Sequence, residues 1–100
     1  MLINLETINI ADRPSVTRIL SAYRPDCVFH FAGSIVGPES VAKPLEYYEN
    51  NTIASHALIS ACLETKTRKF VFSSTAAVYG PQNMLPVDEQ GVLAPISPYG

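Results

Sequence analysis

Apolar and polar positions alternate along the chain in two different rhythms, which predict strands separated by helices. Residues 5–12 (LETINIAD) alternate apolar and polar side chains and include β-branched residues, a pattern typical of a strand. Residues 27–33 (CVFHFAG) and 69–74 (KFVFSS) are short apolar runs. Such runs are typical of parallel strands that are buried on both faces. We therefore expect three strands.

Two helices are predicted between these strands. Asp12 is expected to cap the first helix, with Pro14 close to its first position, and apolar residues then recur at helical spacing until residues 24–26 (RPD) end it. Pro44 opens a longer helix that is expected to run to about Glu64. Strands that alternate with helices predict an α/β protein with a doubly wound parallel sheet.

Small and hydroxyl-bearing residues follow two of the predicted strands. In doubly wound sheets, ligands bind at the carboxyl ends of the strands, and residues 31–34 (FAGS) and 73–75 (SST) are expected there. Ala32 and Gly33 would let the backbone approach a cofactor closely, although an ordinary tight turn explains them as well. The hydroxyls of residues 73–75 fit either a ligand site or the hydrogen bonds of a turn.

Four polar residues inside the predicted elements have less specific roles. Asn50 and Asn51 lie within the long helix, where Asn is a mediocre helix former. Either one of the two amides holds a loop or ligand at the strand ends, or one asparagine is solvated and the other is a local cap. His30 is expected to be a hydrogen-bonded core residue, and His56 has no metal-binding partner in the sequence. No GxSxG motif and no metal site are predicted.

Composition narrows the class of protein. One hundred residues allow a single domain, and a net charge of −2 gives no electrostatic footprint for nucleic acid or an anionic membrane. No apolar run approaches the roughly 20 residues of a membrane span. Cys27 and Cys62 lack metal-binding spacing and a CxxC arrangement, so reduced thiols in a cytoplasmic protein are expected.

Four motifs carry a resemblance to a known family. HFAG, KPLEYYENN, FSSTAAVYG and SPYG, in this order and spacing, resemble the extended short-chain dehydrogenases/reductases of the NAD-dependent epimerase/dehydratase family, and most closely its UDP-glucose 4-epimerases. The resemblance runs from about Asn9 to Gly100. It implies a Rossmann domain that binds NAD, a UDP-sugar substrate and a homodimer. In the family, the helices that open at Pro44 and Tyr99 pack against a second subunit.

The resemblance also implies roles for individual residues. Six positions match the cofactor side of the family's site: Asn9, Ile10, Phe31, Ala32, Gly33 and Asn51. Asn9 and Ile10 would lie beside the adenine, and Asn51 would support the cofactor loop. Thr75 would hydrogen-bond the 4-hydroxyl of the sugar, and Tyr99 would be the catalytic base of a YxxxK motif.

The family mechanism explains these residue types. A tyrosinate removes the proton of the 4-hydroxyl while C4 passes a hydride to NAD⁺, and the 4-keto sugar turns over and receives the hydride on its other face. A phenol with a pKa of about 10 needs a nearby positive charge to ionise at pH 7, which the family's lysine supplies. Where the related 4,6-dehydratases carry acidic residues, this sequence has Ala76 and Ala77, which favours simple epimerisation.

The sequence also departs from the family pattern. The glycine-rich phosphate loop would precede Met1, and the lysine would lie four residues after Tyr99. We therefore expect an internal fragment over residues 1–100 that lacks the first two strands of the sheet and is catalytically silent and marginally stable alone. Ile35 and Asn9 replace a lysine and an aspartate of the family. An enzyme for another nucleotide sugar, or an inactive chain that associates with a homologous subunit, remain alternatives.

Overall fold

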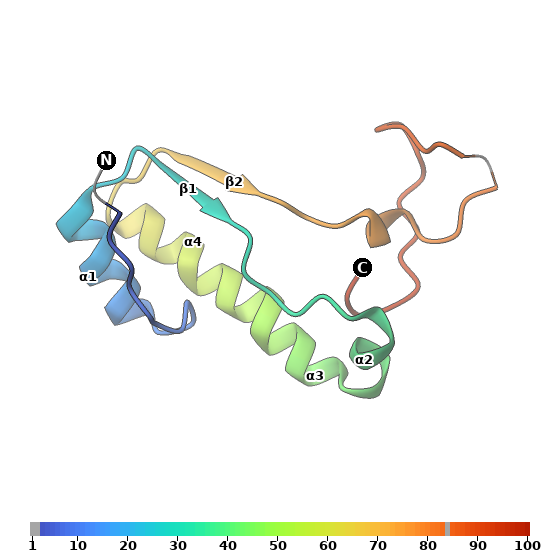
Figure 1. The fold of residues 1–100 in the computed structure, drawn as a ribbon, viewed down its shortest axis with the longest axis horizontal. Coiled ribbons are helices and arrows are strands. Elements are labelled where there is room, and N and C mark those ends of the chain that lie inside the picture. The colour runs from blue at the N-terminus through green and yellow to red at the C-terminus, as the bar shows by residue number, and fades with distance from the viewer. Residues whose placement is uncertain (1–2, 84) are drawn as a thin grey trace.

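The computed structural model describes residues 3–83 and 85–100, and it contains two strands and several helical segments (Figure 1). In chain order the elements are α1 (Arg13–Tyr23), β1 (Cys27–His30), α2 (Gly37–Ala42), α3 (Pro44–Tyr47), the π-helix η1 (Tyr48–Ile53), α4 (Ala54–Glu64), β2 (Lys69–Phe72) and the 3₁₀ helix η2 (Ala76–Tyr79). The segments α3, η1 and α4 follow one another without a break, as the long predicted helix requires.

The two strands form a parallel sheet. Cys27 lies opposite Lys69, and His30 lies opposite Phe72. The chain travels from β1 to β2 through the helical segments α2 to α4, which is the crossover that a parallel pair requires. This βαβ unit confirms the predicted α/β class.

The hydrophobic core lies between the sheet and the two longest α-helices. Figure 1 shows α1 and α4 on the same side of the two strands. The buried cluster consists of Val16 and Leu20 from α1 and Leu58, Ala61 and Cys62 from α4, with Val28 and Phe70 of the strands packed against it. Burial raises the pKa of the Cys62 thiol, which keeps this core residue uncharged.

The opposite face of the sheet is open. Phe29 is 62% exposed and Val71 is 41% exposed. The prediction that both apolar runs are buried on two faces is therefore wrong for the described part of the chain. The reason is that α1 and α4 cover one face, and side chains that alternate along a strand bury only every second residue against it.

Residues 5–12 were expected to form a strand, and this prediction is wrong. Residues 3–12 form no strand and run beside α1, where Tyr23 donates a hydrogen bond of 3.3 Å to Glu6. Alternation alone does not make a strand, because an extended segment needs a neighbour to satisfy its backbone groups. Here Asn9 begins a turn instead, with its carbonyl and its side-chain oxygen accepting from Asp12 and Ala11.

The start of α1 confirms the predicted cap. The Asp12 carboxylate accepts from the backbone N–H of Ser15 at 3.3 Å and from its hydroxyl at 2.7 Å, with Pro14 in the first turn. These hydrogen bonds lower the pKa of Asp12, because they favour the ionised carboxylate. The cap sets the point where the chain turns from the N-terminal segment into the helix.

We predict that Leu58→Ala lowers the free energy of unfolding by about 2 to 4 kcal/mol, because it opens a cavity between α1 and α4. Urea unfolding followed by circular dichroism measures the change. Leu63→Ala on the same helix is the matched control, since Leu63 is 74% exposed and should cost less than about 0.5 kcal/mol. Equal losses in the two variants would contradict the assignment of the core.

Candidate functional site

A cleft of about 680 Å³ lies at the carboxyl ends of β1 and β2. Its volume is within the range of small-molecule and cofactor sites. Four segments that are distant in the sequence line it: the loop after β1, the helix around η1 and α4, the loop after β2, and the last residues of the chain. Six of the eight predicted site residues line this cleft: Phe31, Ala32, Gly33, Asn51, Thr75 and Tyr99.

Asn51 ties the loop after β1 to the helix. Its Oδ1 accepts from the backbone N–H of Ser34 at 2.8 Å, and its Nδ2 donates to the Ser34 carbonyl at 2.8 Å. The neighbouring Asn50 donates from Nδ2 to the Ser34 hydroxyl at 2.8 Å. Of the two alternatives for these asparagines, the structure shows the one in which an amide holds a loop at the strand ends.

Two backbone features allow this contact. Both asparagines lie in η1, whose π-helical turns were not predicted from the sequence and are frequent at functional sites. Gly33 lies directly beside the Asn51 side chain, and a Cβ at this position would come within 3.1 Å of Asn51 Oδ1. The absence of a side chain at Gly33 therefore lets the loop close against the helix.

His30, in β1, contacts the same helix through Ser55. It is 2% exposed, and its ring lies against the rings of Phe70 and Phe72. The Ser55 hydroxyl donates its only proton to the Asn51 carbonyl, so Ser55 accepts from His30 Nε2 at 2.7 Å. The prediction of a hydrogen-bonded core histidine is confirmed. Burial lowers the pKa of His30 below its usual 6.5, and the ring stays neutral at pH 7.

Thr75 follows β2 and begins η2. Its Oγ1 accepts from the backbone N–H of Ala77 at 3.1 Å. Among the described residues its own hydroxyl proton has no acceptor, so it is available to a ligand in the cleft. The preceding Ser74 has a φ of 54°, a left-handed conformation that costs a non-glycine residue free energy and is concentrated at functional sites.

Tyr99 reaches the cleft from the C-terminal segment. Its backbone N–H donates to the hydroxyl of Ser40 at 3.1 Å. Its ring packs edge to face against the ring of Tyr47, at a centroid distance of 6.4 Å. Burial raises the pKa of Tyr47, and its hydrogen bond to Glu39 raises it further. Tyr47 therefore stays protonated, which makes it unsuitable as a base.

Asn9 and Ile10 are not brought to this cleft. Asn9 lines a separate hollow of about 190 Å³, together with Glu49 and Asn50. Its side-chain oxygen is already bonded to the backbone N–H of Ala11 at 2.9 Å. Ile10 is half-buried and lines neither hollow. Their expected roles beside the adenine stay predictions.

Sequence reasoning missed three residues around the site. Ser34 was noted only as part of a strand end, Tyr47 only as part of the motif KPLEYYENN, and Ser40 not at all. Ser40 is fully buried, and Tyr47 is 3% exposed although α3, in which it lies, has only four residues. The only signal was the Ser34 position beside Gly33, because the contacts of Ser40 and Tyr47 join residues far apart in the sequence.

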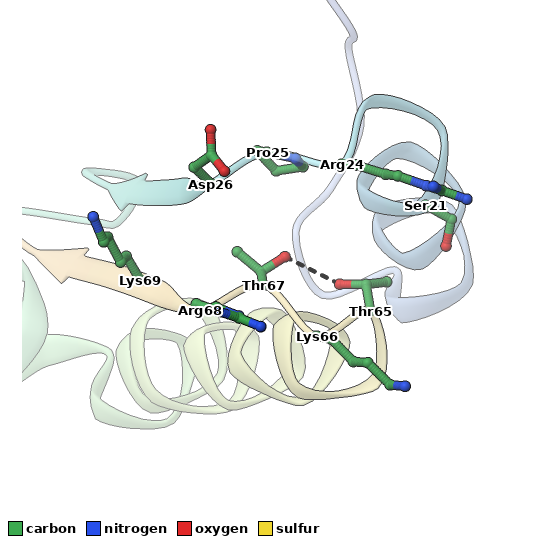
Figure 2. A pocket seen from close by; sticks show the side chains of 9 residues that line it. All are labelled: Ser21, Arg24, Pro25, Asp26, Thr65, Lys66, Thr67, Arg68 and Lys69. Atoms are coloured by element: carbon green, nitrogen blue, oxygen red, sulfur yellow. Dashed lines mark hydrogen bonds between the residues drawn. The ribbon is translucent and has the colours of Figure 1, made fainter.

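A second cleft of about 780 Å³ lies at the opposite ends of the strands (Figure 2). Four cations line it, namely Arg24, Lys66, Arg68 and Lys69. Both α1 and α4 end here, so these charges offset the partial negative charge of two helix C-termini. Figure 2 shows Lys66 and Lys69 pointing away from each other. Although this cleft is larger, its side chains do not converge on a ligand.

Residues 3–83 and 85–100 contain no group of three His, Cys, Asp or Glu residues that could hold a metal ion. No helix in the same residues is long and apolar enough to cross a membrane. The expected cytoplasmic location stays a prediction.

Comparisons with known proteins agree in pointing to one group. A family model described as GDP-mannose 4,6 dehydratase matches residues 2–100. A UDP-glucose 4-epimerase of Azospirillum brasilense is 51% identical over 92 residues, which cover 92% of this chain and 26% of that protein. The chain therefore spans about a quarter of the length of this relative.

Solved structures give the same picture. The UDP-glucose 4-epimerase of Bifidobacterium longum, in complex with NAD⁺ and UDP, matches with a TM-score of 0.93 and 33% identity over 99% of this chain and 30% of that one. The UDP-Glc/GlcNAc 4-epimerase of Campylobacter jejuni matches with a TM-score of 0.87 and 44% identity. The match covers 93% of this chain and 28% of that one. The βαβ unit of this chain is thus part of a Rossmann domain, as predicted.

We predict that the free energy of unfolding falls as the pH is lowered from 7.5 to 5.5. The pKa of His30 is lower in the folded chain than the ordinary 6.5 of the unfolded chain. As the pH falls, the unfolded chain therefore takes up the proton before the folded chain does. The stability that depends on the neutral His30 ring is lost as the pH falls below about 6.5. Urea unfolding at a series of pH values measures this slope.

The control compares the two histidines of the chain. His30→Gln should flatten the slope between pH 7.5 and 5.5, whatever its effect on absolute stability. His56→Gln, at an exposed position, should leave the slope unchanged. A slope that persists in His30→Gln would refute the assignment.

Proposed function

This chain belongs to the family that the GDP-mannose 4,6 dehydratase model describes, and on that premise we propose that it is part of an NAD-dependent UDP-glucose/UDP-galactose 4-epimerase. One observation carries the proposal. A single cleft at the strand ends gathers Phe31, Gly33, Asn51, Thr75 and Tyr99 from four segments of the chain. Cofactor-side and substrate-side candidates thus share one space.

The cofactor side of the cleft fits a dinucleotide. The loop after β1 exposes its backbone at Ala32 and Gly33, and Phe31 offers an apolar ring that is 70% exposed. We assign these three residues to NAD near its pyrophosphate and ribose, and Asn51 to holding their loop in place. When bound there, NAD would supply the acceptor and donor of the hydride that is exchanged at C4 of the sugar.

The substrate side offers two hydroxyls. Thr75 donates its free proton to the 4-hydroxyl oxygen of the sugar and so orients that group. Tyr99, as the phenolate, accepts the 4-hydroxyl proton as the C4–H bond breaks. When the 4-keto sugar is reduced on its other face, Tyr99 gives the proton back. Both groups must lie within hydrogen-bond reach of the same oxygen.

Elimination of water is the competing reaction, because the matching family model is named after a dehydratase. Loss of water across C5 and C6 needs an additional acid and base. The two residues that follow Thr75 are Ala76 and Ala77, in η2, and neither can transfer a proton. This supports epimerisation over dehydration.

Two alternatives have specific support. The Campylobacter jejuni neighbour is a UDP-Glc/GlcNAc 4-epimerase, so another nucleotide sugar is the first. Association with a second subunit is the other, either as the homodimer or as an inactive chain bound to a homologue. Leu45 is 81% exposed and Ile53 is 60% exposed, and these apolar residues of α3 and η1 suit the subunit contact that the resemblance implies.

We predict that Tyr99→Phe lowers kcat at least 100-fold in the protein expressed from its complete gene, since loss of a general base costs roughly 10² to 10⁴ in rate. Conversion of UDP-galactose to UDP-glucose is the assay, and UDP-N-acetylhexosamines and UDP-uronic acids test the alternative sugars. Tyr23→Phe on α1 is the control and should be unchanged. Wild-type kcat in Tyr99→Phe would remove Tyr99 from the mechanism.

We predict that Asn51→Ala weakens NAD retention roughly 10- to 30-fold, because two hydrogen bonds to Ser34 are lost at about 1 kcal/mol each. Equilibrium dialysis against NAD measures the dissociation constant. Asn50→Ala, which loses one exposed hydrogen bond, should change it less than threefold. An Asn51→Ala protein that keeps wild-type affinity would show that the loop needs no such support.

A further inference from the structure

Ser40 is a buried residue whose hydroxyl both donates and accepts a hydrogen bond. It lies in α2 and is fully buried. Its Oγ donates to the Gly37 carbonyl at 2.6 Å and accepts from the backbone N–H of Tyr99 at 3.1 Å. Because the single proton is used on Gly37, a lone pair of Oγ is left to face the Tyr99 N–H.

Tyr47 contacts the side chain of Tyr99, whereas Ser40 contacts its backbone. Its ring meets that of Tyr99 edge to face, at a centroid distance of 6.4 Å and an interplanar angle of 79°. The Tyr47 hydroxyl is fixed in turn, since it accepts from the backbone N–H of Val36 at 3.0 Å and donates to Glu39 at 2.9 Å. The ring against which Tyr99 packs is therefore itself immobilised.

We propose that Ser40 and Tyr47 are positioning residues that set the backbone and the ring plane of Tyr99 at the mouth of the cleft. The inference rests on the proposed function, in which Tyr99 takes the proton of the sugar. Between η2 and Tyr99 the described residues 80–83 and 85–98 form no helix or strand, so no regular element fixes the direction of Tyr99. Contacts to α2 and α3 supply that constraint instead.

Position matters here because proton transfer requires the two oxygens to lie within hydrogen-bond distance. A displacement of about 1 Å in a reacting group can cost roughly 100-fold in rate. Ser40 controls where the Cα of Tyr99 lies, and Tyr47 limits how its ring turns. Loss of either contact should therefore lower kcat and leave substrate affinity in place.

The alternative is that the Ser40 hydroxyl serves only its own helix, as many helical serines do. Ser60 in α4 provides the matched control. Its Oγ donates to the His56 carbonyl at 2.9 Å, a local bond of the same kind, and it has no contact with Tyr99. Ser40→Ala and Ser60→Ala thus remove the same atom from a local helical bond, and they differ in burial and in the bond to Tyr99.

The first test is independent of activity. Amide hydrogen exchange at Tyr99, followed by NMR on the complete gene product, should speed up about tenfold or more in Ser40→Ala. Ser60→Ala should leave it unchanged. Equal Tyr99 exchange rates in wild type and Ser40→Ala would overturn the proposal, even if the protein proves to be no epimerase.

The second test is kinetic. With the epimerase assay, Ser40→Ala should lower kcat about 10- to 100-fold and keep KM within about twofold, with bound NAD unchanged. A rise in KM at constant kcat, or an equal loss in Ser60→Ala, would overturn the positioning role. No turnover by the wild-type protein would count against the proposed function, and the exchange result would still decide the contact.

Tyr47→Phe guards against a Ser40→Ala protein that fails to fold. This variant keeps the ring and removes only the hydroxyl that anchors it, so it should fold and lower kcat about three- to tenfold at constant KM. A wild-type kcat in Tyr47→Phe would remove Tyr47 from the positioning pair. If Ser40→Ala is unfolded, Ser40→Cys replaces it, because a thiol sulfur is only a weak acceptor for the Tyr99 N–H. A wild-type rate of Tyr99 exchange in Ser40→Cys would overturn the positioning role of Ser40.

Discussion

The paired hydrogen bonds between the Asn51 side chain and the Ser34 backbone are the constraint on which the site depends. An amide group matches a peptide group in both directions, so one side chain satisfies the N–H and the C=O of Ser34 together. This fixes the loop after β1 against the helix that crosses to β2. The cleft has a defined wall because its loop is held by a side chain from a helix and not only by its own turn.

The same helix also connects the loop to the buried His30 of β1 through hydrogen bonds. The Asn51 carbonyl accepts from Ser55, whose oxygen meets the ring of His30 in β1. Strand, helix and loop are thereby joined through hydrogen bonds that begin at the buried His30 ring and end at the cleft. Because His30 Nε2, the Ser55 hydroxyl and the Asn51 carbonyl each have a partner, these hydrogen bonds can lie next to an apolar core without a large desolvation penalty.

Local patterns predicted much of this molecule. The cap at Asp12, the helix from Pro44 and the apolar runs that became β1 and β2 depend on neighbouring residues, and each was found. Residues 5–12 show the limit, because a strand also needs a partner, and none lies beside them in the described chain. The π-helical turn at Asn51 and the Tyr99–Ser40 contact depend on tertiary packing, so no periodicity could indicate them. Most of the cleft was predictable because the ends of parallel strands meet.

The open face of the sheet has a consequence for how the chain behaves as a solute. Phe29 and Val71 present a flat, water-wetted patch of hydrocarbon on a molecule with a net charge of only −2. Weak charge repulsion does little to keep such patches apart. We therefore expect an attractive interaction between copies of this chain through its open sheet face, and we expect it to strengthen on warming as the hydrophobic effect does near room temperature. On this expectation, attraction between folded copies, rather than unfolding, would limit the concentration at which this chain stays in solution.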